Sequence, residues 1–387
     1  MESGGTRFEM EIDRDFVAPL GAVCPDHSED DSLQQWVNDH AIASECDFCE
    51  RSGRGAIAAD LGQFAQHVFR SLLLDYGLVD DEGIPYDGAE GGYQAPVLDT
   101  MDVLIDEGLA IHDGLLQCLV GAWQGQAWMK RGEWWLTEDQ ALAYGWSHFR
   151  EVVLTERRFW FHLAARDRHE PSAIPPGELL PSIGIAIEHA RLTRPLLPGS
   201  RLFRAQTHHP DEHLEGAERL GSPPADNAAS NRMSAAGISI FYGAQDPDTT
   251  IAEVRNAETD PQRSAITIGV FEVLKGLRIV DLSAIPEPPG LFHPDAYARP
   301  ALRFLRDFAE DLSRGVSRDR LEHVDYVPTQ VVAEWLRYEF APDGRPIDGI
   351  AYRSAQTPGT CVAVFAGYGS AAERGAMPRP DQPLGLC

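Results

Sequence analysis

Residues 231–255 constrain the fold most strongly, because their pattern requires a strand, a turn and a helix in that order. Within 238–242, Ile and Tyr residues alternate with Ser239 and Phe241, which is typical of a half-buried strand. The segment 246–249 then supplies the Asp, Pro and Thr residues of a turn and a helix N-cap, and apolar residues on one helical face follow. We predict a β–α unit at this point of the chain.

Polar residues mark the ends of this unit. Arg232 precedes the predicted strand, Tyr242 ends it, and Glu253 lies just inside the predicted helix. Taken singly, Glu253 fits an exposed helix position and Tyr242 fits a core aromatic at a strand end. Arg204 lies in a predicted strand with apolar neighbours and fits either a ligand contact or a core ion pair, with Glu253 as one candidate partner. Together they indicate more than a packing unit.

The order of these residues resembles the RES family, which is named for its Arg, Glu and Ser residues. The matching positions are, in order, Arg204, the loop 232–237, Tyr242, Glu253, the segment 326–330 and the segment 349–354, which ends in Ser354. One departure is Ala235, which stands where a proline is common. The resemblance covers residues 198–370, about half of the chain, and no single match within it is specific. Their order and spacing carry the assignment.

The resemblance implies a compact fold similar to ADP-ribosyltransferases, built around a nicotinamide-dinucleotide cleft in residues 199–387. The remaining pattern of short strands and short helices agrees with an α+β domain. We predict strands at 201–205, 238–242, 265–274, 277–282, 350–353 and 361–365, and helices at 301–312 and 329–340. The pair Lys275-Gly276 predicts a hairpin turn, and the tail after Phe365 reads as an irregular surface cover.

The resemblance also assigns roles to the site residues. Cleavage of the N-glycosidic bond of NAD⁺ passes through an oxocarbenium-like state on the ribose, which a nearby carboxylate stabilises. We assign Glu253 to this ribose. Arg204 and Arg232 are assigned to the phosphates, because a guanidinium binds them bidentately. Tyr242 is assigned to the nicotinamide ring or the ribose.

The late serine has a less specific role. We expect Ser354 to donate a hydrogen bond to a phosphate or to the ribose, with Tyr352 and Arg353 as candidates to share this role. A nucleophilic serine is disfavoured, because no histidine stands in a recognisable triad arrangement.

The acceptor of the ADP-ribose group stays open. Members of the family resemble toxin components that deplete NAD⁺ by hydrolysis or phosphorolysis, or that transfer ADP-ribose to a protein. A partner antitoxin commonly occludes the cleft in this family, so an antitoxin or a second copy of the chain is a candidate partner. The long N-terminal region is a candidate for the same restraint in cis.

The first 54 residues predict a structural zinc knuckle. Two Cys-containing pairs have the spacing of a closed zinc site, and the four candidate ligands are Cys24, His27, Cys46 and Cys49. Four protein ligands leave no open position for a catalytic water. His27 is the weakest of the four ligands, with Asp26 and His40 as substitutes. The alternative is a pair of unrelated cysteine-containing turns.

Residues 55–175 predict a mostly helical domain that resembles the HEPN-like region preceding the RES domain in one branch of the family. A ribonuclease is the rival function, because Arg157 and His162 fit an Arg-x4–6-His spacing. The aromatic residues 159–161 between them predict a buried segment, which disfavours an open polar site. Residues 176–198 contain several prolines, so we predict a linker without a long helix.

The net charge and the distribution of apolar residues limit which partners and which cellular location we expect for the chain. The formal charge of −27 disfavours nucleic acid as a partner, because such binding depends on phosphate neutralisation. No apolar stretch is long enough to span a membrane, and residues 1–11 lack a signal-peptide pattern, so we expect a cytoplasmic protein. A non-catalytic module that binds a nucleotide stays as a third hypothesis.

Overall fold

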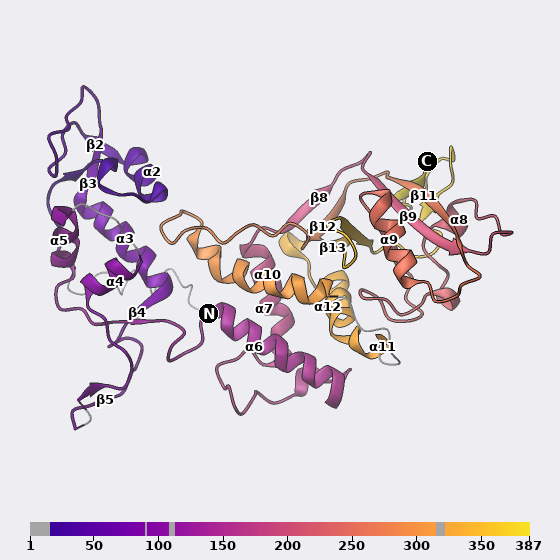
Figure 1. Ribbon diagram of the computed structural model, residues 1–387, viewed down its shortest axis with the longest axis horizontal. Helices are drawn as coiled ribbons and strands as arrows, with labels where there is room; N and C mark the ends of the chain where they lie inside the picture. Colours follow the sequence, from indigo (N-terminus) through magenta and orange to yellow (C-terminus); the bar gives the residue numbers. More distant parts are fainter. Residues whose placement is uncertain (1–15, 90, 108–112, 315–321) are drawn as a thin grey trace. The chain divides into compact units, whose positions relative to one another are not determined.

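The computed structural model describes residues 16–89, 91–107, 113–314 and 322–387. Residues 1–11, from which a signal peptide was judged absent, lie outside the described residues. The chain divides into two compact units: residues 1–137 with 288–299, and residues 138–287 with 300–387 (Figure 1). No helix in the described part of the chain is long and apolar enough to span a membrane.

The first unit combines helices with short strands. Its helices are α2 (Asp31–Asp39), α3 (Leu61–Asp75), α4 (Thr100–Asp106) and α5 (Asp113–Ala122), with the 3₁₀ turns η1 (Pro25–His27) and η5 (Ala296–Ala298). The strands β1 (Ala22–Val23), β2 (Ala41–Ala43) and β3 (Ala58–Asp60) form one sheet in the order β1-β3-β2. Two further antiparallel pairs join β4 (Tyr76–Leu78) to β7 (Trp128–Lys130), and β5 (Tyr86–Asp87) to β6 (Gly92–Tyr93).

Helix α3 is the centre of this unit. Asp60 caps its N-terminus by accepting a hydrogen bond from the backbone of Gln63. Apolar residues along one face of α3 are buried in the core of the unit, which Leu291 and Phe292 of the segment 288–299 complete. The unit is therefore built from two separate stretches of chain.

The His67 imidazole of α3 makes the stability of this unit dependent on pH. The ring stacks on Trp36 at 5.0 Å, and burial lowers its pKa from 6.5 to about 4. In the unfolded chain His67 therefore binds a proton below about pH 6.5, whereas in the folded unit it binds one only below about pH 4. We expect the free energy of unfolding to fall by roughly 3 kcal/mol over this range. Chemical denaturation from pH 7 to 4 measures it, and His67→Gln should show a flatter profile than the wild type; equal profiles would contradict the assignment.

A mixed nine-stranded sheet forms the centre of the second unit. Its strands are β8 (Thr193–Leu196), β9 (Arg201–His208), β10 (Phe241–Ala244), β11 (Ala265–Val273), β12 (Leu277–Asp281), β13 (Gly349–Arg353), β14 (Thr360–Val364), β15 (Ala371–Ala372) and β16 (Leu384–Leu386). Their order in the sheet is β15-β16-β11-β9-β10-β14-β13-β12-β8. The pairs β12–β13 and β15–β16 are parallel, and the other neighbours are antiparallel.

Helices cover both faces of this sheet. They are α6 (Glu138–Glu151) with a π-helical turn η2 (Val152–Glu156), α7 (Pro176–His189), α8 (Ala217–Leu220), α9 (Pro247–Ala257), α10 (Arg299–Ser313), α11 (Glu322–Asp325) and α12 (Val327–Tyr338). Apolar residues of α6, α7, α10 and α12 form one core with Ala363 of β14, whereas Val362 and Val364 belong to a second core that includes α8. This alternation follows the two-residue period of a strand.

The structure confirms most of the predicted elements in the second unit: β9, β11, α9, α10, α12, β13 and β14. The predicted hairpin at Lys275-Gly276 is wrong. Strand β11 pairs with β9 and β16, whereas β12 pairs with β8 and β13. The strand predicted at 238–242 begins only at Phe241. The tail after Phe365 contains β15 and β16, so it is more regular than expected.

Helix α7 occupies the stretch predicted as a linker without a long helix, and that prediction is wrong. Pro176 lies at the start of the helix, where a missing N–H group costs nothing. Pro181 lies inside the helix and removes one internal hydrogen bond. Leu179, Ile183 and Ile187 are fully buried in the core of the unit. Burial of this apolar face offsets the cost of Pro181.

Candidate functional site

A cavity of about 300 Å³ in the second unit gathers most of the predicted site residues. The predicted residues that line it are Arg204, Arg232, Tyr242, Glu253 and Tyr352. Asn231, Tyr326, Gln356 and Cys361 line it as well. The structure therefore brings together residues that are far apart in the sequence.

Neighbouring strands and one helix position these side chains. Arg204 comes from β9, Tyr242 from β10 and Tyr352 from β13, while α9 carries Glu253. The Thr250 hydroxyl accepts a hydrogen bond of 3.0 Å from the backbone of β9, which fixes α9 against the strand that carries Arg204. Asp246 caps α9, as the sequence predicted.

Arg204 is a largely buried cation with unused donors. Its Nη1 donates to the carbonyl oxygen of Tyr242 at 2.8 Å, and its guanidinium lies 5.7 Å from the Phe241 ring centroid. The buried Nε has no acceptor, and no carboxylate within the described ranges forms an ion pair with Arg204. The core ion pair with Glu253 is therefore not observed. Burial lowers the pKa of Arg204 to about 10, so the side chain stays charged at neutral pH.

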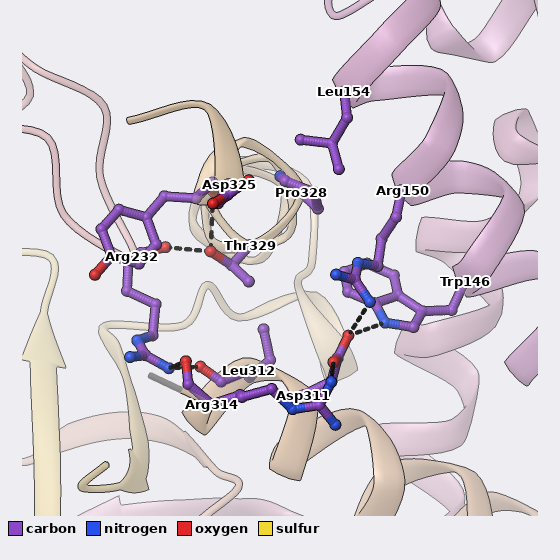
Figure 2. Close-up of a pocket in the computed structure, with 11 residues that line it drawn as sticks. Trp146, Arg150, Leu154, Arg232, Asp311, Leu312, Arg314, Asp325, Pro328 and Thr329 are labelled. Carbon is purple, nitrogen blue, oxygen red and sulfur yellow. Dashed lines mark hydrogen bonds and ion pairs between the residues drawn. The ribbon is translucent and has the colours of Figure 1, made fainter. Parts of the chain in front are cut away.

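The side chain of Arg232 lies at the C-terminal end of α10 (Figure 2). Its Nη1 donates to the carbonyl oxygens of Leu312 and Arg314, the second at 2.9 Å. These bonds satisfy carbonyl groups that a helix end leaves without partners. Among the residues that the structure describes, none accepts a hydrogen bond from Nε or Nη2 of Arg232, so this edge of the guanidinium keeps the geometry for a bidentate anion.

Helix α12 holds the loop that carries Arg232. The Thr329 hydroxyl donates to the carbonyl oxygen of Arg232 at 2.6 Å. Gln330 donates from Nε2 to the carbonyl oxygens of Asn231 and Ser234, at 2.8 and 3.1 Å. The segment 326–330, which belongs to the sequence pattern, therefore positions the loop.

Glu253 and Ser354 contact each other directly. The Ser354 hydroxyl donates to Oε1 of Glu253, and the Cys361 thiol lies 3.8 Å from the same oxygen. Ser354 is buried, and its hydroxyl also accepts hydrogen bonds from the backbone of Gln356 and Thr357. In this arrangement Ser354 orients the carboxylate, and its predicted bond to a phosphate or ribose stays a prediction.

Two of the three tyrosines that line the cavity, Tyr242 and Tyr352, are neutral phenols. Burial raises the pKa of Tyr242 to about 12, and its hydroxyl forms a hydrogen bond of 2.8 Å with Ser234. Burial also raises the pKa of Tyr352 well above its ordinary value. Arg353, the next residue along β13, points away from the cavity: its Nε donates to the carbonyl oxygen of Ser283, and it lines a different cavity. Period-two alternation separates Tyr352 from Arg353.

Sequence reasoning did not identify Cys361, Asn231 or Gln356 as site residues. Cys361 pairs with Tyr352 across β13 and β14, so the predicted strand pair at 350–353 and 361–365 contained a signal for it. Burial, followed by the nearby Glu253 charge, raises the pKa of the Cys361 thiol to about 12, which keeps it protonated. We therefore assign no nucleophilic role to Cys361.

The four candidate metal ligands come together in the first unit. The ligand atoms of Cys24, His27, Cys46 and Cys49 all lie within 4.8 Å of one another, so the group could hold a metal ion. The Cys24 and Cys49 sulfur atoms are 3.7 Å apart, close to the distance of about 3.8 Å that two thiolates have on a tetrahedral zinc ion. Burial raises the pKa of Cys46, but the backbone N–H groups of Phe48 and Cys24 outweigh it, and the net shift is downward.

The two substitute ligands lie outside this group. Asp26 forms an ion pair with Arg51, and His40 stacks on Trp36 at 4.2 Å. His27 therefore completes the set of four.

The segment between Arg157 and His162 is exposed rather than buried. Phe159 is 86% and Trp160 is 64% exposed, so the prediction of a buried segment is wrong. Arg157 lies 3.8 Å from the carboxylate of Glu156. Burial of this segment is therefore no argument against a ribonuclease site, and that hypothesis stays a prediction.

Comparison with family models matches residues 201–386 to the RES domain and residues 39–167 to HEPN/RES N-terminal domain 1. A search of curated proteins found no match. Among solved structures, the chain is similar to one in the crystal structure of the M. tuberculosis MbcT–MbcA toxin–antitoxin complex. That match has 15% sequence identity and a TM-score of 0.28, and it covers 53% of this chain and 88% of the other.

Proposed function

Residues 201–386 are a RES domain that follows a HEPN/RES N-terminal domain 1 at residues 39–167, and from this premise we propose that the chain is an enzyme that consumes NAD⁺. In this proposal NAD⁺ binds in the cavity of Arg204 and Glu253, where the bond between nicotinamide and ribose breaks. The alternative within the same chemistry is transfer of ADP-ribose to a protein side chain.

The observation that carries the proposal is the pair of arginines that have no carboxylate partner among the residues that the structure describes. Arg204 and Arg232 line one cavity, and each guanidinium keeps its Nε–Nη2 edge while Nη1 binds backbone carbonyls. A buried cation without a counter-ion is costly in a protein interior. The net charge of −27 reflects an excess of carboxylates, yet none in the described part of the chain pairs with Arg204. A diphosphate supplies the missing negative charge in the bidentate geometry that guanidinium groups prefer.

Glu253 supplies the catalytic charge. As the C–N bond breaks, its electron pair moves to the nicotinamide ring and neutralises the pyridinium, and positive charge develops on the ribose. The Glu253 carboxylate, oriented by Ser354, stabilises this charge. An acceptor oxygen then bonds to the anomeric carbon and loses its proton. We propose water or phosphate as the acceptor, which makes the enzyme a glycohydrolase or a phosphorylase.

Incubation of the purified chain with NAD⁺, with and without phosphate, tests the proposal by mass spectrometry of the products. Nicotinamide with ADP-ribose identifies hydrolysis, a phosphorylated ADP-ribose identifies phosphorolysis, and a mass gain on protein identifies transfer. Bound but intact NAD⁺ would instead support a non-catalytic binding module. A protein antitoxin or a second copy of the chain stays the candidate partner, to be sought by co-purification.

Arg204→Met is expected to lower kcat/KM for NAD⁺ cleavage by about a hundredfold. The reason is loss of the diphosphate contact, while an apolar side chain of similar length suits a buried position. Steady-state kinetics measures the effect, and Arg204→Lys should retain part of the activity because it keeps the charge. If Arg204→Met is as active as the wild type, then Arg204 does not contact the diphosphate and its assignment to the site is wrong.

We also propose that Cys24, His27, Cys46 and Cys49 hold a structural Zn²⁺. The sulfur separation and the Cys₃His donor set support this assignment. When bound, the ion links the residues on both sides of α2. We assign no catalytic step to it.

A further inference from the structure

A second cavity, of about 290 Å³, adjoins the site and has no role in the chemistry above. Figure 2 shows its walls: Trp146 and Arg150 of α6 with Leu154 of η2 on one side, the end of α10 on another, and the start of α12 on a third. Arg232 and Tyr326 line both cavities. The two spaces therefore meet at the residue that we assign to the diphosphate.

The size of the first cavity argues for a second compartment. Its volume of about 300 Å³ is at the lower limit of about 300–1,000 Å³ for pockets that enclose a drug-sized ligand. A dinucleotide is larger, since it consists of two nucleosides joined through a diphosphate. If Arg232 contacts the diphosphate, one nucleoside extends to the Glu253 side of Arg232, and the other must extend to the opposite side.

The lining of the second cavity suits an uncharged nucleoside. The Asp311 carboxylate accepts hydrogen bonds of 2.9 Å from both Trp146 and Arg150, and it lies 3.2 Å from Arg314, so its charge is compensated within the protein. Leu154 and Pro328 add apolar surface.

The exposed carboxylate of Asp325 is another polar group of this cavity that can bind a ligand. It has no hydrogen-bond or ion-pair partner among the residues that the structure describes. A carboxylate without a partner accepts hydrogen bonds from hydroxyl groups, such as those of a ribose, whereas it repels an anion. This lining favours a neutral nucleoside over a second phosphate.

We infer that the cavity lined by Trp146, Arg150, Leu154 and Asp325 binds the adenosine half of NAD⁺, on the far side of Arg232 from Glu253. This inference rests on the proposed function. It makes the second cavity a subsite for the part of the substrate that does not react.

Nicotinamide mononucleotide, which lacks the adenosine half, provides the test. In the full chain, Leu154→Trp should fill the cavity and raise KM for NAD⁺ by about tenfold or more, while kcat/KM for nicotinamide mononucleotide stays within about twofold. Leu163→Trp is the matched control: it adds the same side chain at an exposed leucine that lines neither cavity, and it should leave both values within about threefold of the wild type. Asp325→Asn, an exposed change without structural risk, should raise KM for NAD⁺ alone by about threefold or more.

Three results would overturn the inference: an unchanged KM for NAD⁺ in both Leu154→Trp and Asp325→Asn, an equal loss with both substrates, or an equal loss in Leu163→Trp. Calorimetric titration with AMP separates the subsite from the reaction. Binding of AMP by the wild type that Leu154→Trp abolishes supports the subsite even if no NAD⁺ is cleaved, in which case the proposed reaction fails alone. NAD⁺ cleavage without any AMP binding would count against the subsite and leave the reaction intact.

Discussion

Glu253→Gln is expected to lower kcat for NAD⁺ cleavage by about a thousandfold, which corresponds to roughly 4 kcal/mol of transition-state stabilisation. The amide keeps the size of the side chain, and its oxygen can still accept the hydrogen bond from Ser354. Only the negative charge opposite the developing oxocarbenium ion is lost. The affinity for NAD⁺ should therefore stay within about threefold of the wild-type value. Single-turnover release of nicotinamide measures the rate, and calorimetric titration measures the affinity.

Glu258→Gln is the matched control for this experiment. Glu258 follows directly on α9 and loses the same charge, but its carboxylate binds Thr207 and Arg263 and does not line the cavity. Its variant should keep kcat within about threefold of the wild type. If Glu253→Gln cleaves NAD⁺ as fast as Glu258→Gln does, then the carboxylate has no role in the chemistry and the site assignment is wrong.

The sequence was sufficient to place two candidate site residues, Tyr242 and Glu253, in a strand and in the helix that follows it. Tyr242 and Glu253 were singled out from a local pattern of alternation and N-capping. The structure has the predicted helix, but Tyr242 is the second residue of β10 and not the end of the strand. Local patterns of this kind fix backbone geometry over a few residues.

Contacts between distant residues could not be predicted in this way. Arg232 binds the carbonyl oxygen of Leu312, 80 positions later, and Ser354 binds Glu253 across 101 positions. Sequence spacing carries no information on such contacts. The family resemblance led us to expect that Ser354 contacts the substrate, and no spacing argument predicted that its hydroxyl donates to the Glu253 carboxylate.

The errors in the fold have the same origin. Lys275-Gly276 has the composition of a hairpin turn, but β11 and β12 each pair with other strands. A turn signal does not determine which strands pair, since register depends on the whole sheet. In α7, the local cost of Pro181 is outweighed by tertiary burial of Ile183 and Ile187, which a propensity argument leaves out.

Removal of the proposed zinc is expected to produce the largest loss of stability. Cys46→Ser should lower the free energy of unfolding of the first unit by about 4 kcal/mol or more, because binding of a structural zinc contributes directly to folding. In the wild-type chain without the ion, two buried sulfur atoms and a buried imidazole would lie close together with no cation to bind them. The expected shift of the unfolding midpoint is roughly 10 °C. Thermal unfolding followed by tryptophan fluorescence detects it, since Trp36 lies in α2 between the two ligand pairs.

Cys118→Ser separates loss of the metal from loss of a thiol. Cys118 lies in α5 of the same unit, is half-buried and is not a member of the ligand group. Its variant should unfold close to the wild-type temperature and retain one zinc ion per chain, whereas Cys46→Ser should retain none. A chelator should reproduce the effect of Cys46→Ser on the wild type, because both remove the same ion. The zinc proposal is wrong if the purified chain contains no zinc and Cys46→Ser unfolds at the same temperature as Cys118→Ser. In that case side-chain packing alone stabilises the segment that carries the four ligands.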